Sequence, residues 1–442
     1  MKLPNLLETR IGRLTAFFFL YMTQGIPFGF TSIAVATQMR REGVGPAAIG
    51  SFVATLYIPW AWKWMIGPVV DVFYCDRLGR RRLWIVVAQV MMATALMAAM
   101  PVNFSTQIKL FTVLIFIHNI FAATQDVAVD ALACGVLKED ERGLANGLMF
   151  GGSYLGTAVG GAGVLFLTSY VGFNGTFFFV AGCILAITTF VAVPLREPRS
   201  KAPSDSFNGL SLLNTLLDIR GYVWTVFPAI FGSRAAVVGL VFALMPMGAY
   251  ALGLALQANL AVELGLSDGR IAVLSLLSTI ISAAGCIVGG FLSDKFGRKR
   301  MLALYLAATA IPTVALAILM YHHGWIMSVD PRMPNRPVPP DALVVGFWAA
   351  TLIYSVPQGL MYGTRTALFM DITNPKVAAT QFTAYMALLN LVIAYSALWQ
   401  GQAIEAWGYP ATLLIDAAVG LLCIALLPLM TRPSSSENSS LE

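Results

Sequence analysis

Residues 290–300 read GFLSDKFGRKR, in which an aspartate, Asp294, and four basic residues follow the end of a long apolar run. Residues 67–82 read GPVVDVFYCDRLGRRR and contain the same elements, with four residues inserted after Asp71. Each copy follows the second apolar run of one half of the chain. The repeat therefore predicts that the chain consists of two related halves, each built around the same loop.

The composition is that of a membrane protein. Of the 442 residues, 58% are hydrophobic and 11% are charged, and the mean hydropathy is +0.75. Soluble domains carry about 25% charged residues, so this chain has too few charges to cover a soluble globule of its size. The composition also excludes an extracellular disulfide scaffold, a disordered chain and a nucleic-acid binder. The five cysteines form no C-x-x-C pair, so we expect neither a disulfide framework nor a metal site.

Twelve apolar runs have the length of a membrane helix, about 20 residues. They lie at 14–38, 47–70, 83–101, 110–137, 143–170, 175–194, 222–255, 270–292, 301–321, 342–371, 376–404 and 410–430. The runs 222–255 and 342–371 are long and contain glycine or proline, so we expect them to be tilted or broken. No segment outside these runs shows the alternation of apolar and polar residues that is typical of a β-strand. The prediction is an all-helical integral membrane protein with a six-helix bundle over 1–194, a cytoplasmic linker over 195–221, a second six-helix bundle over 222–431 and a disordered tail over 432–442.

The basic residues predict an orientation in the membrane. With the N-terminus in the cytoplasm, the cytoplasmic segments hold 19 of the 28 Lys and Arg residues, the opposite side holds six, and three lie inside spans. Cytoplasmic loops of membrane proteins are enriched in Lys and Arg. We therefore expect a multi-pass protein of the inner or plasma membrane with both termini in the cytoplasm.

The repeated loop resembles the signature of the major facilitator superfamily, and duplicated halves are the usual build of such transporters. Four segments of the first half, within residues 15–195, resemble the AmpG muropeptide permease family: KWMIGPVVD (63–71), ATQDVAVDA (123–131), ERG (141–143) and GIP (25–27). This resemblance implies the major facilitator fold and a proton-driven importer, and related members carry acetyl-CoA or siderophores. The chain reads LACG at 132–135 and GSYL at 152–155, where the resemblance leads us to expect a cation.

The two repeated loops are candidate gates. Asp71 and Asp294 end their helices near the N-terminus of a neighbouring span, where a carboxylate is stabilised. The arginines that follow can hydrogen-bond carboxylates and helix-end carbonyls, so each loop could hold one end of the bundle shut. The alternative is that the basic residues only set the topology. The candidate gating residues are Asp71, Arg77, Arg80, Arg81, Asp294, Arg298 and Lys299.

Two carboxylates lie deep inside the fourth run. Asp126 is thirteen residues from Glu139 at the cytoplasmic end, which corresponds to about 20 Å of helix. Asp130 lies four residues later and therefore on the same face. Two carboxylates this close in a low dielectric should not both be ionised easily, which is what proton coupling needs. The alternative is that they hydrogen-bond neighbouring helices and hold them together.

Three cations also lie inside predicted spans. Arg234 is about twelve residues into the seventh run, or roughly 18 Å deep, and we expect it to pair with a carboxylate of the substrate or of the protein. Arg365 and Lys63 are further candidates for an anionic substrate, although Lys63 could instead snorkel or rest on an aromatic ring. Other side chains that could bind a polar ligand, or simply join helices, are Gln24, Gln125, Asn119, Tyr57, Gln358 and Tyr362.

The predicted function is proton-coupled import by alternating access. The cargo expected from the resemblance is an amphipathic organic anion, most directly a muropeptide. A siderophore or another metabolite or drug is the alternative within transport, because the expected cations are missing. A non-transporting membrane receptor is the alternative outside it, and no catalytic constellation indicates a membrane enzyme. The glycine-rich run 151–163 lacks a G-K-[ST] ending and predicts close helix packing. We expect a monomer in contact with lipids, with no cofactor, metal or nucleic acid.

Overall fold

The computed structural model describes residues 5–66, 70, 79, 81–104, 106–137, 142–197, 234–372 and 378–430. Several predictions concern residues outside these ranges. Among them are the gating residues Asp71, Arg77 and Arg80, most of the linker, the start of the seventh run and the tail. The side chain of Asp294 also lies outside the described part. These predictions, like the domain boundaries, stay predictions.

Every regular element in the described ranges is a helix, and the helices group into two compact units. The first unit contains residues 1–35 and 62–221, and the second contains 36–61 and 222–442. Residues 36–61 thus pack with the second unit, although the chain places them among the first six runs.

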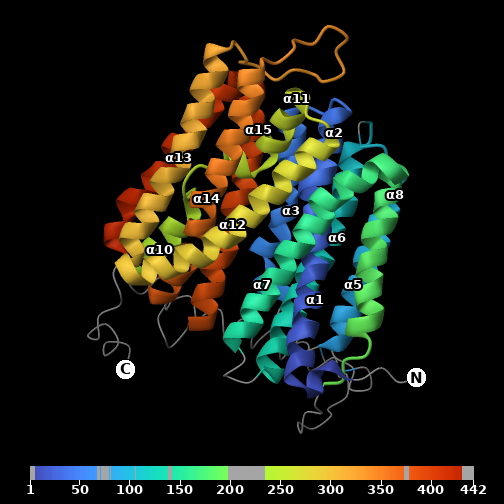
Figure 1. Ribbon diagram of the computed structural model, residues 1–442. Helices are drawn as coiled ribbons and strands as arrows, with labels where there is room; N and C mark the ends of the chain where they lie inside the picture. Colours follow the sequence, from blue (N-terminus) through green and yellow to red (C-terminus); the bar gives the residue numbers. More distant parts are fainter. Residues whose placement is uncertain are drawn as a thin grey trace. The chain divides into compact units, whose positions relative to one another are not determined.

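Two helix pairs pack side by side in the first unit, α1 with α7 and α5 with α6 (Figure 1). The helices of this unit are η1 (Leu6–Glu8), α1 (Arg10–Gly29), η2 (Phe30–Val35), η3 (Lys63–Met65), α5 (Arg82–Ala99), α6 (Ile108–Val136), α7 (Arg142–Ala158), η5 (Val159–Gly163), α8 (Val164–Ile187) and η6 (Thr188–Ala192). Of these, η2, η5 and η6 are π-helical. They continue α1, α7 and α8, respectively.

The second unit is built around two long helices, α14 and α15. Helix α14 packs against α12 and α13, and α15 packs against α3. The helices of this unit are α2 (Ala36–Arg41), α3 (Pro46–Ala61), α10 (Arg234–Leu244), η7 (Ala251–Gly253), α11 (Ala255–Glu263), α12 (Asp268–Phe296), α13 (Arg298–His322), α14 (Asp341–Ile372), α15 (Ala378–Leu422) and η9 (Cys423–Leu429).

Eight of the described helical segments are long and apolar enough to cross a membrane. The two longest, Gly147–Ala192 and Gln381–Leu429, each join two of the predicted runs. A glycine with positive φ marks the junction in each case, Gly172 at 71° and Gly408 at 80°. Glycine adopts this backbone without a steric penalty, so one long segment can reverse direction there. The total of twelve spans stays a prediction, since part of the seventh run lies outside the described residues.

The seventh run is broken, as its length and composition predicted. Helix α10 ends at Leu244, the chain is not helical from Met245 to Tyr250, and α11 begins only at Ala255. The other long run, 342–371, forms the continuous helix α14 and passes through Pro357 without a break. Only one of the two runs therefore has the expected discontinuity.

Glycines let α1 and α7 approach closely, which confirms the packing expected of the run 151–163. Gly25 and Gly29 on α1 face the backbone of α7 and η5, while Gly156 and Gly160 face the backbone of α1. A Cβ atom on Gly160 would overlap the carbonyl oxygen of Ile26. Since both sides of this contact are backbone, neither can turn aside as a flexible side chain would.

Replacing Gly160 by alanine is expected to destabilise the protein. An overpacked contact typically costs about 1–3 kcal/mol, so the midpoint of thermal unfolding in detergent should fall by several degrees. The matched control is Gly151→Ala on α7, where a Cβ atom would meet nothing within 4 Å. An unchanged midpoint for Gly160→Ala would show that the two helices are not in backbone contact here.

Candidate functional site

Two carboxylates of α6 form an acidic cluster in the first unit, as their spacing predicted. Asp126 is 5% exposed, and its Oδ2 lies 2.9 Å from the Nζ atom of Lys63. Gln24 of α1 donates a hydrogen bond from Nε2 to Asp126 Oδ1 at 2.9 Å. The hydroxyl of Tyr21, one turn earlier on α1, donates to Asp130 Oδ1. The acidic cluster is therefore Asp126, Asp130, Lys63, Gln24 and Tyr21.

Lys63 is the counter-ion of Asp126 in the acidic cluster. Lys63 lies in the short helix η3, and its side chain is 21% exposed while that of Asp126 is 7% exposed. A buried carboxylate is costly unless it is paired and hydrogen-bonded, and Lys63 and Gln24 supply both. Protonation of Asp126 would remove the charge that holds the ammonium group. Asp126 can therefore either form the ion pair with Lys63 or bind a proton, but not both.

The neighbouring polar residues of α6 do not join this cluster. Gln125 is buried, and its Nε2 donates to the carbonyl of Leu20 and to the hydroxyl of Thr23 at 2.9 and 2.7 Å. Successive helix positions are 100° apart, so Gln125 points to a different side from Asp126. Asn119 is buried, and its Nδ2 has no partner among the described residues. Gln125 therefore joins α6 to α1, which was the alternative role for such residues.

A basic site lies on α14 in the second unit. Arg365 is 2% exposed, and its Nη1 donates to the hydroxyl of Tyr250 at 3.3 Å. Its guanidinium carbon lies 4.6 Å from the centre of the Tyr362 ring, within the range of a cation–π interaction. Its Nε has no hydrogen-bond partner, and no carboxylate of the described residues forms an ion pair with it. A buried cation without an anion is the arrangement expected of a site that receives one.

Two further predicted ligands lie near this basic site. Tyr57 of α3 is close enough to Tyr250 and Tyr362 to interact with them electrostatically. Gln358 lies two turns before Arg365 on α14, and its Oε1 accepts a hydrogen bond from Ser282 of α12 at 3.1 Å. Tyr362, whose ring lies beside the guanidinium, is 41% exposed. We keep Tyr57 and Tyr362 as candidate ligands, whereas Gln358 already joins two helices.

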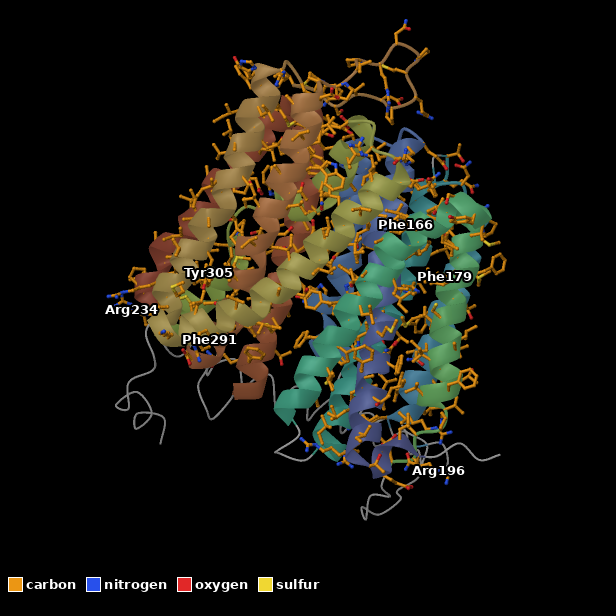
Figure 2. All side chains as sticks on the ribbon, in the orientation of Figure 1. Phe166, Phe179, Arg196, Arg234, Phe291 and Tyr305 are labelled. Carbon is orange, nitrogen blue, oxygen red and sulfur yellow. The ribbon has the colours of Figure 1, made fainter. Side chains whose placement is uncertain are left out.

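Of the two partners expected for Arg234, the described part of the structure supplies no carboxylate of the protein. This residue begins the described part of α10 and is exposed (Figure 2). No carboxylate of the described residues forms an ion pair with it. The depth assigned to Arg234 was counted over residues 222–234, of which only Arg234 itself lies in the described part. Its exposed side chain does not fit a buried ion pair within the protein, whereas its depth in the membrane and a role in binding the substrate stay predictions.

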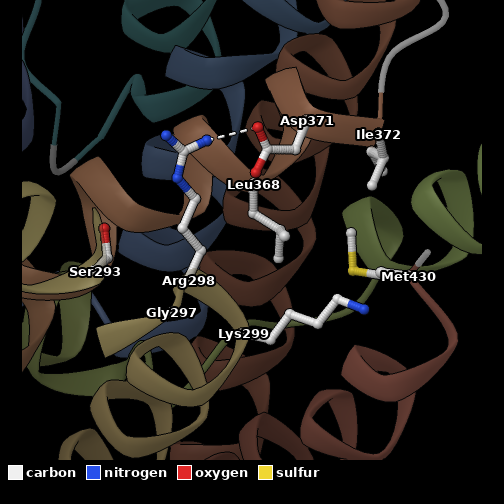
Figure 3. Close-up of a pocket in the computed structure, with 8 residues that line it drawn as sticks. All are labelled: Ser293, Gly297, Arg298, Lys299, Leu368, Asp371, Ile372 and Met430. Atoms are coloured by element: carbon white, nitrogen blue, oxygen red, sulfur yellow. Dashed lines mark ion pairs between the residues drawn. The ribbon is translucent and has the colours of Figure 1, made fainter. Parts of the chain in front are cut away.

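Two of the gating residues that the structure describes, Arg298 and Arg81, have hydrogen-bond or ion-pair partners. Arg298 forms an ion pair with Asp371 at 2.7 Å, at the edge of a cavity of about 480 Å³ (Figure 3). Lys299 also lines this cavity. In the first repeat, the backbone N–H groups of Arg81 and Arg82 donate to one oxygen of Glu197 at 2.8 and 2.6 Å. Glu197 thus caps the start of α5, where an anion is stabilised. A gating role for these residues stays a prediction.

A buried ion pair in the second unit was missed by the sequence analysis, and we call it the Arg40 clasp. Glu263 Oε1 accepts hydrogen bonds from Arg40 Nε and Nη2 at 2.9 and 2.6 Å and from the Tyr409 hydroxyl at 2.6 Å. The backbone N–H of Val329 donates to Oε2 of Glu263, and the backbone carbonyl of Val329 accepts a hydrogen bond from Arg40. The clasp thus joins α2, α11, α15 and the loop 323–340. The sequence showed only that Arg40 lies between two runs, because its partner is 223 residues away.

Comparisons with known proteins show which family model and which relatives the chain matches. Residues 15–247 and 238–442 match the family model described as Major Facilitator Superfamily. The chain is similar to the anhydromuropeptide permease of Escherichia coli, with 24% identity over 418 residues that cover 92% of this chain and 77% of the permease. It is also similar to the putative transporter AmpG 4 of Rickettsia conorii, with 22% identity over 94% of this chain and 95% of that protein. The predicted resemblance is thereby confirmed.

Solved structures show the same fold. A D-xylose–proton symporter superimposes with a TM-score of 0.68 and 13% identity, covering 96% of this chain and 99% of that one. The nucleoside transporter NupG superimposes with a TM-score of 0.66 and 12% identity, covering 95% and 100%. At these identities the likeness concerns the fold alone, and it confirms the predicted all-helical architecture.

Proposed function

Because the chain belongs to the major facilitator superfamily, and is thus a multi-pass membrane transporter and not an enzyme, we propose that it imports an amphipathic organic anion together with protons. The observation that carries this proposal is Arg365, a buried guanidinium without a carboxylate partner among the described residues. The planar guanidinium binds carboxylates through two parallel hydrogen bonds. Tyr362 adds an aromatic face beside it, which suits a cargo with both charged and apolar parts.

We infer that the cargo is an anhydro-muropeptide. The similarity to the anhydromuropeptide permease of Escherichia coli extends over 92% of this chain and supports this substrate. The likeness to sugar and nucleoside transporters concerns the fold, so it does not favour those substrates. The direction we propose is import across the inner membrane into the cytoplasm, with both termini cytoplasmic and the protein acting as a monomer.

Proton coupling is assigned in this proposal to the acidic cluster. Asp126 exchanges its ion pair with Lys63 for a proton, and Asp130 is hydrogen-bonded by Tyr21 one helical turn away. Loss of the ion pair removes the attraction that holds the Lys63 side chain, which belongs to a short helix, against α6. The proposed cycle is alternating access, in which proton binding at this cluster and anion binding at Arg365 belong to one transport step.

Uptake into proteoliposomes tests the proposal. Vesicles that contain the purified protein are given radiolabelled anhydro-muropeptide, with or without an acidic outside pH, and xylose and a nucleoside serve as comparison substrates. We expect accumulation of the anhydro-muropeptide only with the gradient, and no accumulation in empty vesicles. Accumulation of xylose or the nucleoside instead would show that anhydro-muropeptide is not the substrate. Accumulation that does not depend on the pH gradient would show that transport is not coupled to protons.

Replacing Arg365 by glutamine is expected to raise the KM for the anhydro-muropeptide at least tenfold. Loss of one partner of a desolvated charge pair usually costs about 2 kcal/mol or more. The thermal stability should change little, because no described carboxylate loses its counter-ion. Arg270→Gln, at an exposed position of α12, is the matched control. A KM equal to that of the parent would mean that Arg365 does not bind the substrate.

A further inference from the structure

The break in the seventh run is held by a buried carboxylate that the proposed transport steps do not use. Asp416 of α15 is 2% exposed, and its Oδ2 accepts hydrogen bonds from the backbone N–H groups of Tyr250 and Ala251 at 2.8 and 2.9 Å. Its other oxygen accepts from Nε2 of Gln400 at 2.7 Å. No cation of the described residues forms an ion pair with Asp416. Its charge is therefore balanced by hydrogen bonds.

The other backbone groups of the break are held by neutral partners. The N–H of Gly248 donates to the carbonyl of Gly420 at 3.1 Å, and the N–H of Ala249 donates to the Thr309 hydroxyl at 3.0 Å. Tyr354 donates from its hydroxyl to the carbonyl of Ala249 at 2.7 Å. A broken helix inside a membrane protein must satisfy these groups within the protein. Among the partners of the break, Asp416 accepts hydrogen bonds from two backbone N–H groups, whereas Thr309 and Gly420 each accept from one.

Tyr250 connects this carboxylate with the basic site. Its backbone N–H is bound by Asp416, and its hydroxyl accepts the hydrogen bond from Arg365. Arg365 has few other fixed contacts, since its Nε is unpaired and Tyr362 offers only a ring face. The hydrogen bond to the Tyr250 hydroxyl therefore restrains the position of the guanidinium. If the break shifted, the hydroxyl and the guanidinium would shift with it.

We propose that Asp416 is a positioning residue for anion binding: it fixes the break at Tyr250 and, through the Tyr250 hydroxyl, the orientation of Arg365. This inference rests on the proposed function of Arg365 as the anion ligand. Asp416 itself does not touch the substrate. Its carboxylate acts as a two-fold acceptor for backbone N–H groups, so its acceptor oxygens matter more than its charge.

The charge and the acceptor role can be separated by two variants. Asparagine keeps an oxygen that can accept from both backbone N–H groups, and its amide can donate to the unpaired Oε1 of Gln400. Alanine removes the acceptor altogether. Since members of one hydrogen-bond network are strongly coupled, we expect Asp416→Ala to raise the KM for the anhydro-muropeptide by about tenfold and Asp416→Asn by about twofold at most. Equal effects of both variants would overturn the positioning role in favour of the charge.

A double-variant comparison tests the route through Tyr250. We expect Tyr250→Phe alone to raise the KM, and Asp416→Ala to add little to it, because both changes release the same guanidinium. If the two substitutions instead raise the KM by independent factors that multiply, Asp416 does not act through Tyr250. If Asp416→Ala does not assemble, Gln400→Leu loosens the same carboxylate and should raise the KM by a smaller factor, which Tyr250→Phe again should mask.

Hydrogen exchange separates failure of this inference from failure of the proposed function. Without any substrate, the amides of Tyr250 and Ala251 should exchange faster in Asp416→Ala than in the parent, and as slowly as in the parent in Asp416→Asn. If the parent takes up no anhydro-muropeptide, the proposed substrate is wrong, while the exchange rates still show whether Asp416 holds the break. Unchanged exchange in Asp416→Ala would overturn the inference on its own.

Discussion

Replacing Asp126 by asparagine is expected to abolish accumulation of the substrate against a gradient. Each pH unit is a factor of ten in proton activity, so a gradient of about two units supports about 100-fold accumulation with one proton per substrate. Asparagine cannot take up a proton, and its amide cannot balance the ammonium of Lys63, which lies 2.9 Å from Oδ2 in the parent. The variant should therefore reach only equal concentrations on both sides.

The measurement is the accumulation ratio in proteoliposomes as a function of the outside pH. Exchange of labelled for unlabelled substrate serves as a second readout, because exchange needs no net proton movement and should persist in the variant. Asp330→Asn is the matched control, since Asp330 is a partly exposed carboxylate that pairs with the exposed Arg332 in the loop 323–340. If Asp126→Asn accumulates substrate at the parental rate and with the parental pH dependence, Asp126 is not the coupling residue.

The second large effect is expected at the Arg40 clasp. Glu263 is 1% exposed and Arg40 is 2% exposed, so Glu263→Gln leaves a buried guanidinium without its carboxylate. Breaking a buried ion pair on one side typically costs about 3–5 kcal/mol. Glutamine also loses an acceptor for Arg40, Tyr409 or the Val329 N–H, because its amide nitrogen can only donate. The variant should unfold at a clearly lower temperature in detergent.

The prediction for the Arg40 clasp is tested by comparing the thermal unfolding of the parent, Glu263→Gln, a matched control and a double variant. Glu405→Gln is the matched control, since Glu405 is exposed and accepts only the backbone N–H of Ala47 among the described contacts; its effect should stay below about 1 kcal/mol. The double variant Arg40→Met with Glu263→Leu removes both charges and should recover part of the lost stability, since apolar residues often replace a buried pair well. A parental unfolding temperature for Glu263→Gln would mean that the pair is not buried.

The acidic cluster was the part of the site that sequence reasoning reached most directly. A spacing of four residues on one helix places Asp126 and Asp130 on one face, whatever surrounds them. Their partners could not be read in the same way. Lys63 is 63 residues from Asp126 and Tyr21 is 109 residues from Asp130, so both contacts depend on how α1 and η3 pack against α6.

The surroundings of Arg234 and the partner of Arg298 could not be predicted from positions along the chain. Position along a run was converted into expected burial, although burial depends on which helices pack beside a residue. Arg234 is exposed, and no carboxylate of the described residues forms an ion pair with it. Asp371, near the end of α14, pairs with Arg298 of α13. The repeated loop had marked Arg298 as important, but its acceptor is supplied by another helix.

The sequence alone determined that this protein is an all-helical membrane protein, because hydrophobic length is a local signal, and the resemblance of its loops and first-half segments to a known family indicated a transporter. The sequence also determined which charges lie inside apolar runs. Only the tertiary structure decided which of these charges are paired, that residues 36–61 pack with the second unit, and that Asp416 holds a break in another helix. The physical reason is that burying a charge requires a partner, but the requirement does not specify which distant residue provides it.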